Sequence, residues 1–157
     1  DDALSAGSGN DTIDFVNFDG QAEGVNADLT DGTISLADGS LQSIVGFRTV
    51  LATDQGDTIR GSHRSDTIYG RGGADEIDGD RDADTIYGGN GFDTILGGQG
   101  ADALYGEAQK DRINGGDGND TISGGTEDDV LSGEDGDDSL SGDEGAGIIT
   151  NPADIIA

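Results

Sequence analysis

The sequence predicts an all-β protein built as a solenoid of short parallel strands. Between Ala52 and Thr150 the chain divides into eleven consecutive nonapeptides, and the eighth residue of every unit is isoleucine or leucine. Glycine is abundant, with 30 of 157 residues, whereas proline occurs once. One apolar residue in every nine, at a fixed interval, indicates repeated short strands joined by glycine-rich turns, with each coil packing on its neighbours.

The charge of the chain limits the partners that it can have. Acidic residues number 34 and basic residues 7, so the formal net charge is −27. Nucleic acid and anionic membrane surfaces attract clustered lysine and arginine, so we expect neither as a partner and expect cations instead. No apolar run is long enough for a transmembrane helix. Ile, Leu, Val and Phe make up about 20% of the chain, which is close to the level below which a highly charged chain is expected to be disordered. The regular placement of these residues is what favours a fold.

Residues 1–51 are expected to form an N-terminal cap on the repeat array. One outlying unit, AGSGNDTID at 6–14, has the repeat pattern and places Asp11 at its sixth position. Residues 24–36 alternate apolar and polar side chains on both sides of Asp31-Gly32, which predicts a β-hairpin or two adjoining strands. The hydrophobic segment 44–51 then leads into the array, and we expect the cap to cover the open edge of the first coil.

The array itself occupies residues 52–150. Each unit has a single apolar residue between polar ones near its end, so each three-residue strand is predicted to point one side chain inward. Aspartate holds the sixth position in ten units and is replaced only at Gly147. The inward residues are Ile59, Ile68, Ile77, Ile86, Ile95, Leu104, Ile113, Ile122, Leu131, Leu140 and Ile149.

Three units, at 88–96, 97–105 and 115–123, match the full pattern G-G-x-G-x-D-x-U-x, where U is a large apolar residue. The pattern resembles that of the calcium-binding RTX (repeats-in-toxin) family, and the resemblance covers 52–150 and the outlying unit. It implies a right-handed parallel β-roll with two short-strand sheets and about 18 residues per coil. In that family the first six residues of a unit turn around Ca²⁺ and the last three form a strand.

The resemblance also implies where calcium binds. With two units per coil, loops on one edge belong to alternate units, and each ion is expected between neighbouring loops, held by the sixth-position aspartates of both and by backbone carbonyls. This allows up to eight inter-loop sites. The predicted side-chain ligands are Asp57, Asp66, Asp75, Asp84, Asp93, Asp102, Asp111, Asp120, Asp129 and Asp138, with Asp11 in the outlying unit. The predicted carbonyls lie near Gly73, Gly89, Gly91, Gly98, Gly100, Gly116, Gly118 and Gly136.

The loops do not match the pattern equally well. The fourth-position glycine is replaced by Gln55, Arg64, Asp82, Gln109 and Glu127. Arg64, Arg81 and Lys110 add positive charge in or beside these loops, and a nearby cation repels Ca²⁺ or substitutes for it. We therefore expect weaker or empty sites there. The best-formed pairs are Asp102–Asp120, Asp120–Asp138 and Asp75–Asp93.

Three tyrosines, Tyr69, Tyr87 and Tyr105, stand at the ninth positions of alternate units. If one coil takes two units, they stack as a ladder on the outer face of one sheet. The ladder has two interpretations, a structural stack of side chains or an aromatic strip that binds sugars.

Catalytic signatures are absent from the sequence. It has no cysteine, no H-E-x-x-H and no G-x-S-x-G, and His63 is its only histidine, which we expect to be an exposed loop residue. We therefore predict no enzymatic activity in these residues. The array is followed by the start of a C-terminal flank at 151–157, whose unpaired apolar residues, like the first residue Asp1, suggest that a parent chain extends further.

The sequence therefore predicts a calcium-binding module of a secreted bacterial protein. The RTX resemblance implies export by a type I secretion apparatus, followed by folding outside the cell on binding Ca²⁺, and a role in export and stability. We expect a monomer. Alternatives are a ligand-binding module for polysaccharide or a cell-surface receptor, or a spacer, within an adhesin, surface-layer protein or toxin; the parent chain is alternatively an enzyme.

Overall fold

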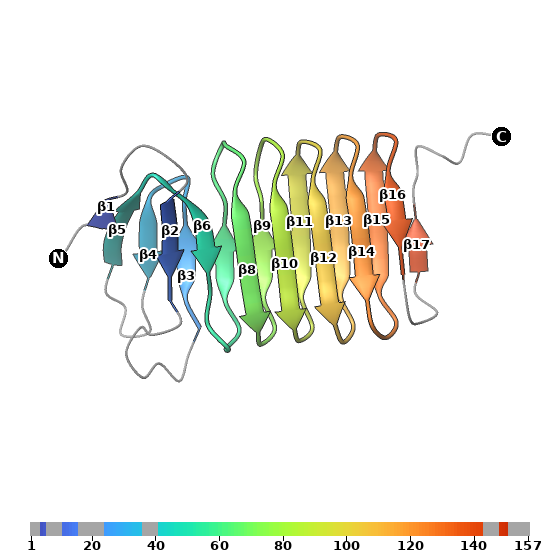
Figure 1. Ribbon diagram of the computed structural model, residues 1–157, viewed down its shortest axis with the longest axis horizontal. Helices are drawn as coiled ribbons and strands as arrows, with labels where there is room; N and C mark the ends of the chain where they lie inside the picture. The colour runs from blue at the N-terminus through green and yellow to red at the C-terminus, as the bar shows by residue number, and fades with distance from the viewer. Residues whose placement is uncertain (1–3, 6–10, 16–23, 36–40, 143–147, 151–157) are drawn as a thin grey trace.

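The computed structural model describes residues 4–5, 11–15, 24–35, 41–142 and 148–150, and their main feature is an elongated two-sheet solenoid (Figure 1). For 4–5, 41–45 and 148–150 it describes the backbone alone. Every element of the described chain is a β-strand, and no described segment forms a helix able to cross a membrane. The predicted all-β class is therefore confirmed.

Two sheets form the two walls of the solenoid. One contains seven strands in the order β16-β14-β12-β10-β8-β6-β2 and the other ten in the order β1-β5-β4-β3-β7-β9-β11-β13-β15-β17. The strands of the first sheet are β2 (Asp11–Asp14), β6 (Phe47–Leu51), β8 (Thr67–Gly72), β10 (Thr85–Asn90), β12 (Ala103–Ala108), β14 (Thr121–Gly125) and β16 (Ser139–Ser141). Those of the second are β1 (Leu4–Ser5), β3 (Asn26–Asp28), β4 (Thr33–Ser35), β5 (Leu41–Val45), β7 (Thr58–Arg60), β9 (Glu76–Asp78), β11 (Thr94–Gln99), β13 (Arg112–Asp117), β15 (Val130–Asp135) and β17 (Ile148–Thr150).

Within the array, successive strands alternate between the two sheets, and each pairs in parallel with the strand two elements further along the chain. Ile86 of β10 is in register with Ile68 of β8 and with Leu104 of β12, so one coil takes two nonapeptide units. The same step relates Ile77, Ile95 and Ile113 in the other sheet. The predicted parallel β-roll with two units per coil is confirmed.

The core is a double row of single side chains between the sheets. The eighth residues of nine consecutive units, from Ile59 to Leu131, are at most 1% exposed. Leu140 in the next unit is partly buried and packs against this core. The side chain predicted at Ile149 lies outside the described side chains. Each coil therefore contributes two inward apolar residues, as the sequence predicted.

The strands differ from the prediction in their length. Six of them, such as Thr85–Asn90, continue through the first three residues of the next unit, which the sequence analysis had assigned to the turn. Pairing continues between Gly89 and Glu107 because successive coils repeat the same path at the spacing of parallel strands. The turn proper is therefore confined to the fourth to sixth positions of these units.

The N-terminal segment continues both sheets of the roll. β3 and β4 form the predicted antiparallel hairpin, with Gly32 in the turn at φ 67°. β3 then pairs in parallel with β7, the first strand of the array in its sheet, while β2 and β6 extend the other sheet beyond β8. Phe15, Val25, Ala27, Ile34 and Val50 are buried and extend the core of the coils.

The tyrosine ladder forms as predicted. Tyr69, Tyr87 and Tyr105 occupy equivalent positions of β8, β10 and β12. Their ring centroids are 4.9 Å apart, with planes inclined by 3° and 10°. Because parallel stacked rings cover one another's faces, the central ring has no free face on which a sugar could stack. The geometry favours the structural interpretation.

Candidate metal-binding loops

The sixth-position aspartates lie inside the turns at the two long edges of the roll. The loops of one edge follow the strands of one sheet, so the aspartates of alternate units are neighbours along an edge. From Asp57 to Asp129 these side chains are between 1% and 3% exposed, and Asp138 in the last described loop is partly buried. They are interior groups of the turns, and this burial distinguishes them from a solvated acidic surface.

Each aspartate is hydrogen-bonded to the equivalent aspartate of the next coil. The backbone N–H of Asp93, for example, donates to Oδ1 of Asp111 at 2.9 Å, and Oδ1 of Asp93 accepts from the N–H of Asp75 at 2.9 Å. All eight neighbouring pairs expected from the sequence are joined in this way, at 2.7–2.9 Å. The predicted aspartates are therefore brought together in the predicted pairs.

The second carboxylate oxygen of most of these aspartates has no hydrogen-bond donor. The atom is fully buried, and it faces the first-position glycine of its own loop. A Cβ placed on Gly97 would lie 2.5 Å from Oδ2 of Asp102 and 2.5 Å from the carbonyl oxygen of Gly115. A buried carboxylate oxygen without a hydrogen-bond partner is costly unless a proton or a cation neutralises the group. The residues with such an Oδ2 include Asp75, Asp84, Asp93, Asp102, Asp111, Asp120 and Asp138.

Burial changes the protonation of these carboxyl groups. Desolvation, partly offset by the backbone N–H that each accepts, raises the pKa of Asp75 and of Asp111 to about 7 and that of Asp84 to about 8. It raises the pKa of Asp102 to about 6. Neighbouring aspartates add like-charge repulsion in each of these cases. Without a counter-charge, the aspartates of both edges therefore bind protons at pH values above the range that is usual for aspartate.

The first loop of the array differs from the others. Oδ1 of Asp57 accepts the N–H of Val25 from the N-terminal segment at 2.5 Å, and Oδ2 accepts the N–H of Thr53 at 2.9 Å. Thr53 Oγ1 lies 3.0 Å from the same carboxylate. Both carboxylate oxygens of Asp57, which was predicted as a metal ligand, thus accept hydrogen bonds from protein groups. Burial nevertheless raises the pKa of Asp57.

The next loop and the outlying unit also have their own geometry. Asp66 accepts the N–H of Ser62 through Oδ2 at 2.6 Å, which leaves its buried Oδ1 without a partner. Asp11 begins β2, and its buried Oδ2 has no partner either. Its register neighbour in β6 is Phe47, so the structure does not pair Asp11 with another sixth-position aspartate.

Glycine at the second and fourth positions provides the left-handed backbone of the turns. Gly89 and Gly98 at second positions have φ 110°, and Gly91 and Gly100 at fourth positions have φ 147° and 152°. Seven non-glycine residues also take positive φ there, which side chains rarely adopt. They are Arg71, Asp80, Asp82, Glu107, Gln109, Glu127 and Glu134.

The donor set of these edges fits calcium. Among the described residues no three acidic, histidine or cysteine side chains converge, so an ion between two loops would need backbone carbonyls beside the carboxylates. Carboxylate and carbonyl oxygens are the ligands that Ca²⁺ prefers. In the loops of Asp75, Asp84, Asp93, Asp102, Asp111, Asp120 and Asp138, the unpartnered Oδ2 atom supplies one carboxylate oxygen. The residues present therefore suit an oxygen-bound divalent cation.

The first-position glycines were not recognised from the sequence as part of the site. None has a positive φ, so their role is to leave room for the aspartate carboxylate and for the backbone of the next coil. The signal was present in the sequence, since ten of the eleven units begin with glycine.

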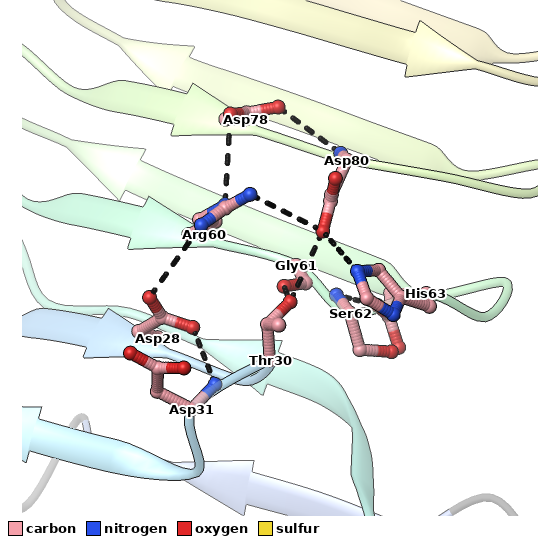
Figure 2. A network of polar contacts seen from close by, with 10 residues as sticks. Asp28, Thr30, Asp31, Arg60, Gly61, Ser62, His63, Asp78 and Asp80 are labelled. Atoms are coloured by element: carbon pink, nitrogen blue, oxygen red, sulfur yellow. Dashed lines mark hydrogen bonds and ion pairs between the residues drawn. The ribbon is translucent and has the colours of Figure 1, made fainter.

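A polar network at the start of the array was also not predicted (Figure 2). The guanidinium of Arg60 lies 4.0 Å from Asp28, 3.9 Å from Asp78 and 3.4 Å from Asp80. His63 is exposed, as predicted, and its Nε2 lies 3.3 Å from Oδ2 of Asp80. Thr30 Oγ1 lies within hydrogen-bond distance of the same carboxylate and of the Gly61 carbonyl, at 3.1 and 3.0 Å. These residues come from separate coils, and no motif marks them.

Comparison with known proteins agrees with this geometry. The family model described as RTX calcium-binding nonapeptide repeat (4 copies) matches residues 1–15, 51–86, 78–113, 87–122 and 114–149. The match includes the outlying unit and nearly all of the array. A comparison with curated proteins returns no match.

Proposed function

Because this chain belongs to the RTX calcium-binding nonapeptide repeat family, whose β-rolls are structural calcium-binding modules, we propose that Ca²⁺ binds between successive loops of each edge and that this binding drives folding. The side-chain ligands in this proposal are the sixth-position aspartates, and the remaining ligands are backbone carbonyls of the glycine turns. The division into a cap at 1–51 and a calcium-binding roll at 52–150 belongs to the same proposal.

The buried, unpartnered carboxylate oxygens are the observation that supports the proposal. Such atoms stand at equivalent positions in consecutive loops of each edge, at Asp75, Asp93 and Asp111 on one edge and at Asp84, Asp102, Asp120 and Asp138 on the other. Ionised carboxylates in this setting are unfavourable until a cation or a proton neutralises them. A divalent cation neutralises two aspartates at once, and the pairs along each edge supply two.

The small core explains why folding would depend on the metal. Each strand of the array buries one large apolar side chain, so little hydrophobic surface offsets the entropy of ordering the coils. The net charge of −27 further favours an expanded chain in the absence of cations. Binding of calcium to the folded form alone couples metal affinity to folding.

This coupling supports a role in export. RTX repeats are typical of secreted proteins, and we propose a secreted or cell-surface location for this module, reached by type I secretion. The acidic chain would remain unfolded where calcium is scarce and fold where it is abundant. In this proposal the roll is a monomeric export and stability scaffold.

We propose no catalytic role for these residues, because the buried acidic side chains repeat as equivalent turns of a structural module. Binding of a polysaccharide or receptor stays the alternative function. At Tyr87 it would have to use the hydroxyl group and the ring edge, since both faces of that ring are stacked, on Tyr69 and on Tyr105.

The proposal predicts a calcium-specific folding transition. Far-UV circular dichroism of the metal-stripped chain should show a disordered spectrum, and titration with Ca²⁺ should produce a sigmoidal rise of strand signal. The sigmoidal form is expected because successive sites share aspartates, so filling one site orders the next.

Magnesium at the same ionic strength is the control, because it demands a tighter octahedral geometry and gives up its water reluctantly. If magnesium or sodium chloride produced the same transition, charge screening would explain folding and the proposed calcium sites would be contradicted. A strand-rich spectrum of the metal-stripped chain at neutral pH would also contradict the coupling.

A further inference from the structure

One outer face of the roll carries no charge over six neighbouring strands. It is formed by the seventh- and ninth-position side chains of β8, β10, β12, β14 and β16 and by the equivalent residues of β6, which flank the inward core residues and point away from them. None of these side chains is buried. We call this surface the hydroxyl face, and its residues are Thr49, Leu51, Thr67, Tyr69, Thr85, Tyr87, Ala103, Tyr105, Thr121, Ser123, Ser139 and Ser141.

The composition of the hydroxyl face is not a consequence of the repeat alone. Ten of its twelve side chains carry a hydroxyl group and none is charged, although the chain has a net charge of −27. The equivalent positions of the other sheet, on β3, β7, β9, β11, β13 and β15, allow a direct comparison. There three of twelve side chains carry a hydroxyl group and five are charged, namely Asp28, Arg60, Glu76, Asp78 and Arg112.

The hydroxyl groups of this face recur at a constant interval along the roll. Thr67 is in register with Thr85 and Tyr69 with Tyr87, and the same register holds through all six strands. The tyrosine rings repeat at 4.9 Å, which is the spacing of neighbouring strands. Because the stacked rings cover one another's faces, they present their edges and hydroxyl groups to the outside. The face therefore offers two parallel rows of uncharged polar groups along the axis of the roll.

These properties limit the ligand that the face suits. A hydroxyl group both donates and accepts hydrogen bonds, so a ligand rich in hydroxyl groups can pair with the rows. An anionic ligand, or a second copy of this acidic chain, is repelled by the net charge of −27. The strands follow one another in a straight row, so only a ligand that is itself straight and repetitive stays in contact with successive coils (Figure 1).

We propose that the hydroxyl face binds an uncharged, extended polysaccharide that lies along the axis of the roll. Threonine, serine and tyrosine hydroxyl groups form the hydrogen bonds, and several coils contact one sugar chain at the same time. The face exists only in the folded roll, so this inference rests on the proposed calcium-dependent folding and adds a ligand to it.

Native gel electrophoresis in excess calcium tests the proposal. Soluble hydroxyethylcellulose, galactomannan and xyloglucan, cast separately into the gel, are uncharged extended probes, and at least one of them should retard the full chain. Carboxymethylcellulose shares its backbone with hydroxyethylcellulose but is anionic, and it should not retard the chain. Retardation by carboxymethylcellulose as strong as that by the uncharged probes would overturn the proposal.

Thr85→Glu and Thr94→Glu are a matched pair that locates the binding face. Both threonines follow a buried aspartate, precede a buried isoleucine and are partly exposed, but they lie on opposite sheets. Thr85→Glu places a charge in the middle of the hydroxyl face and should weaken binding about tenfold or more, because the ligand would desolvate that charge. Thr94→Glu adds the same charge to the face that already has charged residues and should leave binding unchanged. Equal effects of the two substitutions would overturn the assignment to the hydroxyl face.

A triple variant, Tyr69→Phe with Tyr87→Phe and Tyr105→Phe, tests the same face without adding a charge. It keeps the stacked rings and removes three hydroxyl groups, so it should fold with calcium as the unchanged chain does and bind the polysaccharide several times more weakly. Undiminished binding by this variant would overturn the role given to the tyrosine hydroxyl groups.

Circular dichroism of the same samples separates this inference from the proposed function. A chain that folds with calcium and is retarded by none of the three uncharged polysaccharides would overturn the inference and leave the proposed function intact. A calcium-dependent dimer that Thr85→Glu abolishes, measured by analytical ultracentrifugation, would show that a second copy occupies the face and would also overturn it. A chain that does not fold with calcium would contradict the proposed function, and the inference with it.

Discussion

A single aspartate makes several of the contacts that hold one coil to the next. The N–H of Asp93 donates to Asp111, its Oδ1 accepts from Asp75, and its carbonyl accepts the N–H of Arg112 at 2.9 Å. Its Oδ2 is left for a cation. In the proposed function the residue is therefore structural and metal-binding at once, and a neutral replacement should separate the two roles.

The variant Asp102→Asn should make this separation. The asparagine carbonyl keeps the acceptor for the N–H of Asp84, so the coil can still form. Loss of the buried charge should stabilise the calcium-free fold by about 1–3 kcal/mol, because the carboxylate is desolvated there. The calcium midpoint should move to higher concentration, since two sites lose a charged ligand. Chemical denaturation with and without calcium measures both effects.

Asp137→Asn is the control for this change. Asp137 belongs to a glycine-rich loop but is exposed, so its neutralisation should change both quantities little. Equal effects of the two substitutions would show that overall charge, and not the buried oxygen, determines calcium dependence.

At the scale of the strands and turns, glycine has two separate roles. Second and fourth positions need a left-handed backbone, whereas first positions need space beside the aspartate. The steric role of the first position can be tested with alanine, by comparing a first-position glycine with a third-position glycine that has neither role.

Gly97→Ala in β11 should destabilise the calcium-bound roll by about 1–3 kcal/mol, because the added methyl group presses on Asp102 and on the next coil. Gly72→Ala in β8 is the matched case. A Cβ there meets its nearest atom at 3.7 Å and the residue has no positive φ, so stability should change by less than about 0.5 kcal/mol. Thermal unfolding in excess calcium compares them, and equal losses would contradict the steric role of the first position.

The period of nine residues was enough to predict the coil, the inward row and the paired aspartates, because each follows from residues at equivalent positions. The extra length of strands such as Thr85–Asn90 was missed, since glycine at the first two positions resembles turn sequence. The network around Arg60 was missed for another reason. Asp28 reaches it from the N-terminal segment, and Asp78 and Asp80 reach it from the next coil, and none of them has a repeat position that marks it as a partner.

For the whole molecule, the buried carboxyl groups make stability depend on pH in the absence of metal. Their pKa values are raised in the folded chain, to about 7 for Asp75 and Asp111 and about 8 for Asp84, above the usual value of 3.8. The folded state therefore binds more protons than the unfolded state between these values, and its stability falls as pH rises through that window.

Metal-stripped protein should consequently gain strand signal as the pH is lowered from about 8 to about 4 at constant ionic strength, measured by circular dichroism. With calcium present the effect should reverse in sign, because protons compete with the metal for the same oxygens and the calcium midpoint should rise at low pH. A metal-stripped chain with the same spectrum at both pH values would contradict this account.

The aspartate hydrogen bonds also give the roll a direction. In every pair the earlier coil donates and the later coil accepts. A cut after Tyr105 would leave one fragment with the N–H groups of Asp93 and Asp102 at its end and the other with the carboxylates of Asp111 and Asp120 at its beginning. The two cut surfaces are unlike and complementary, so the aspartate hydrogen bonds can form again only when such fragments meet head to tail.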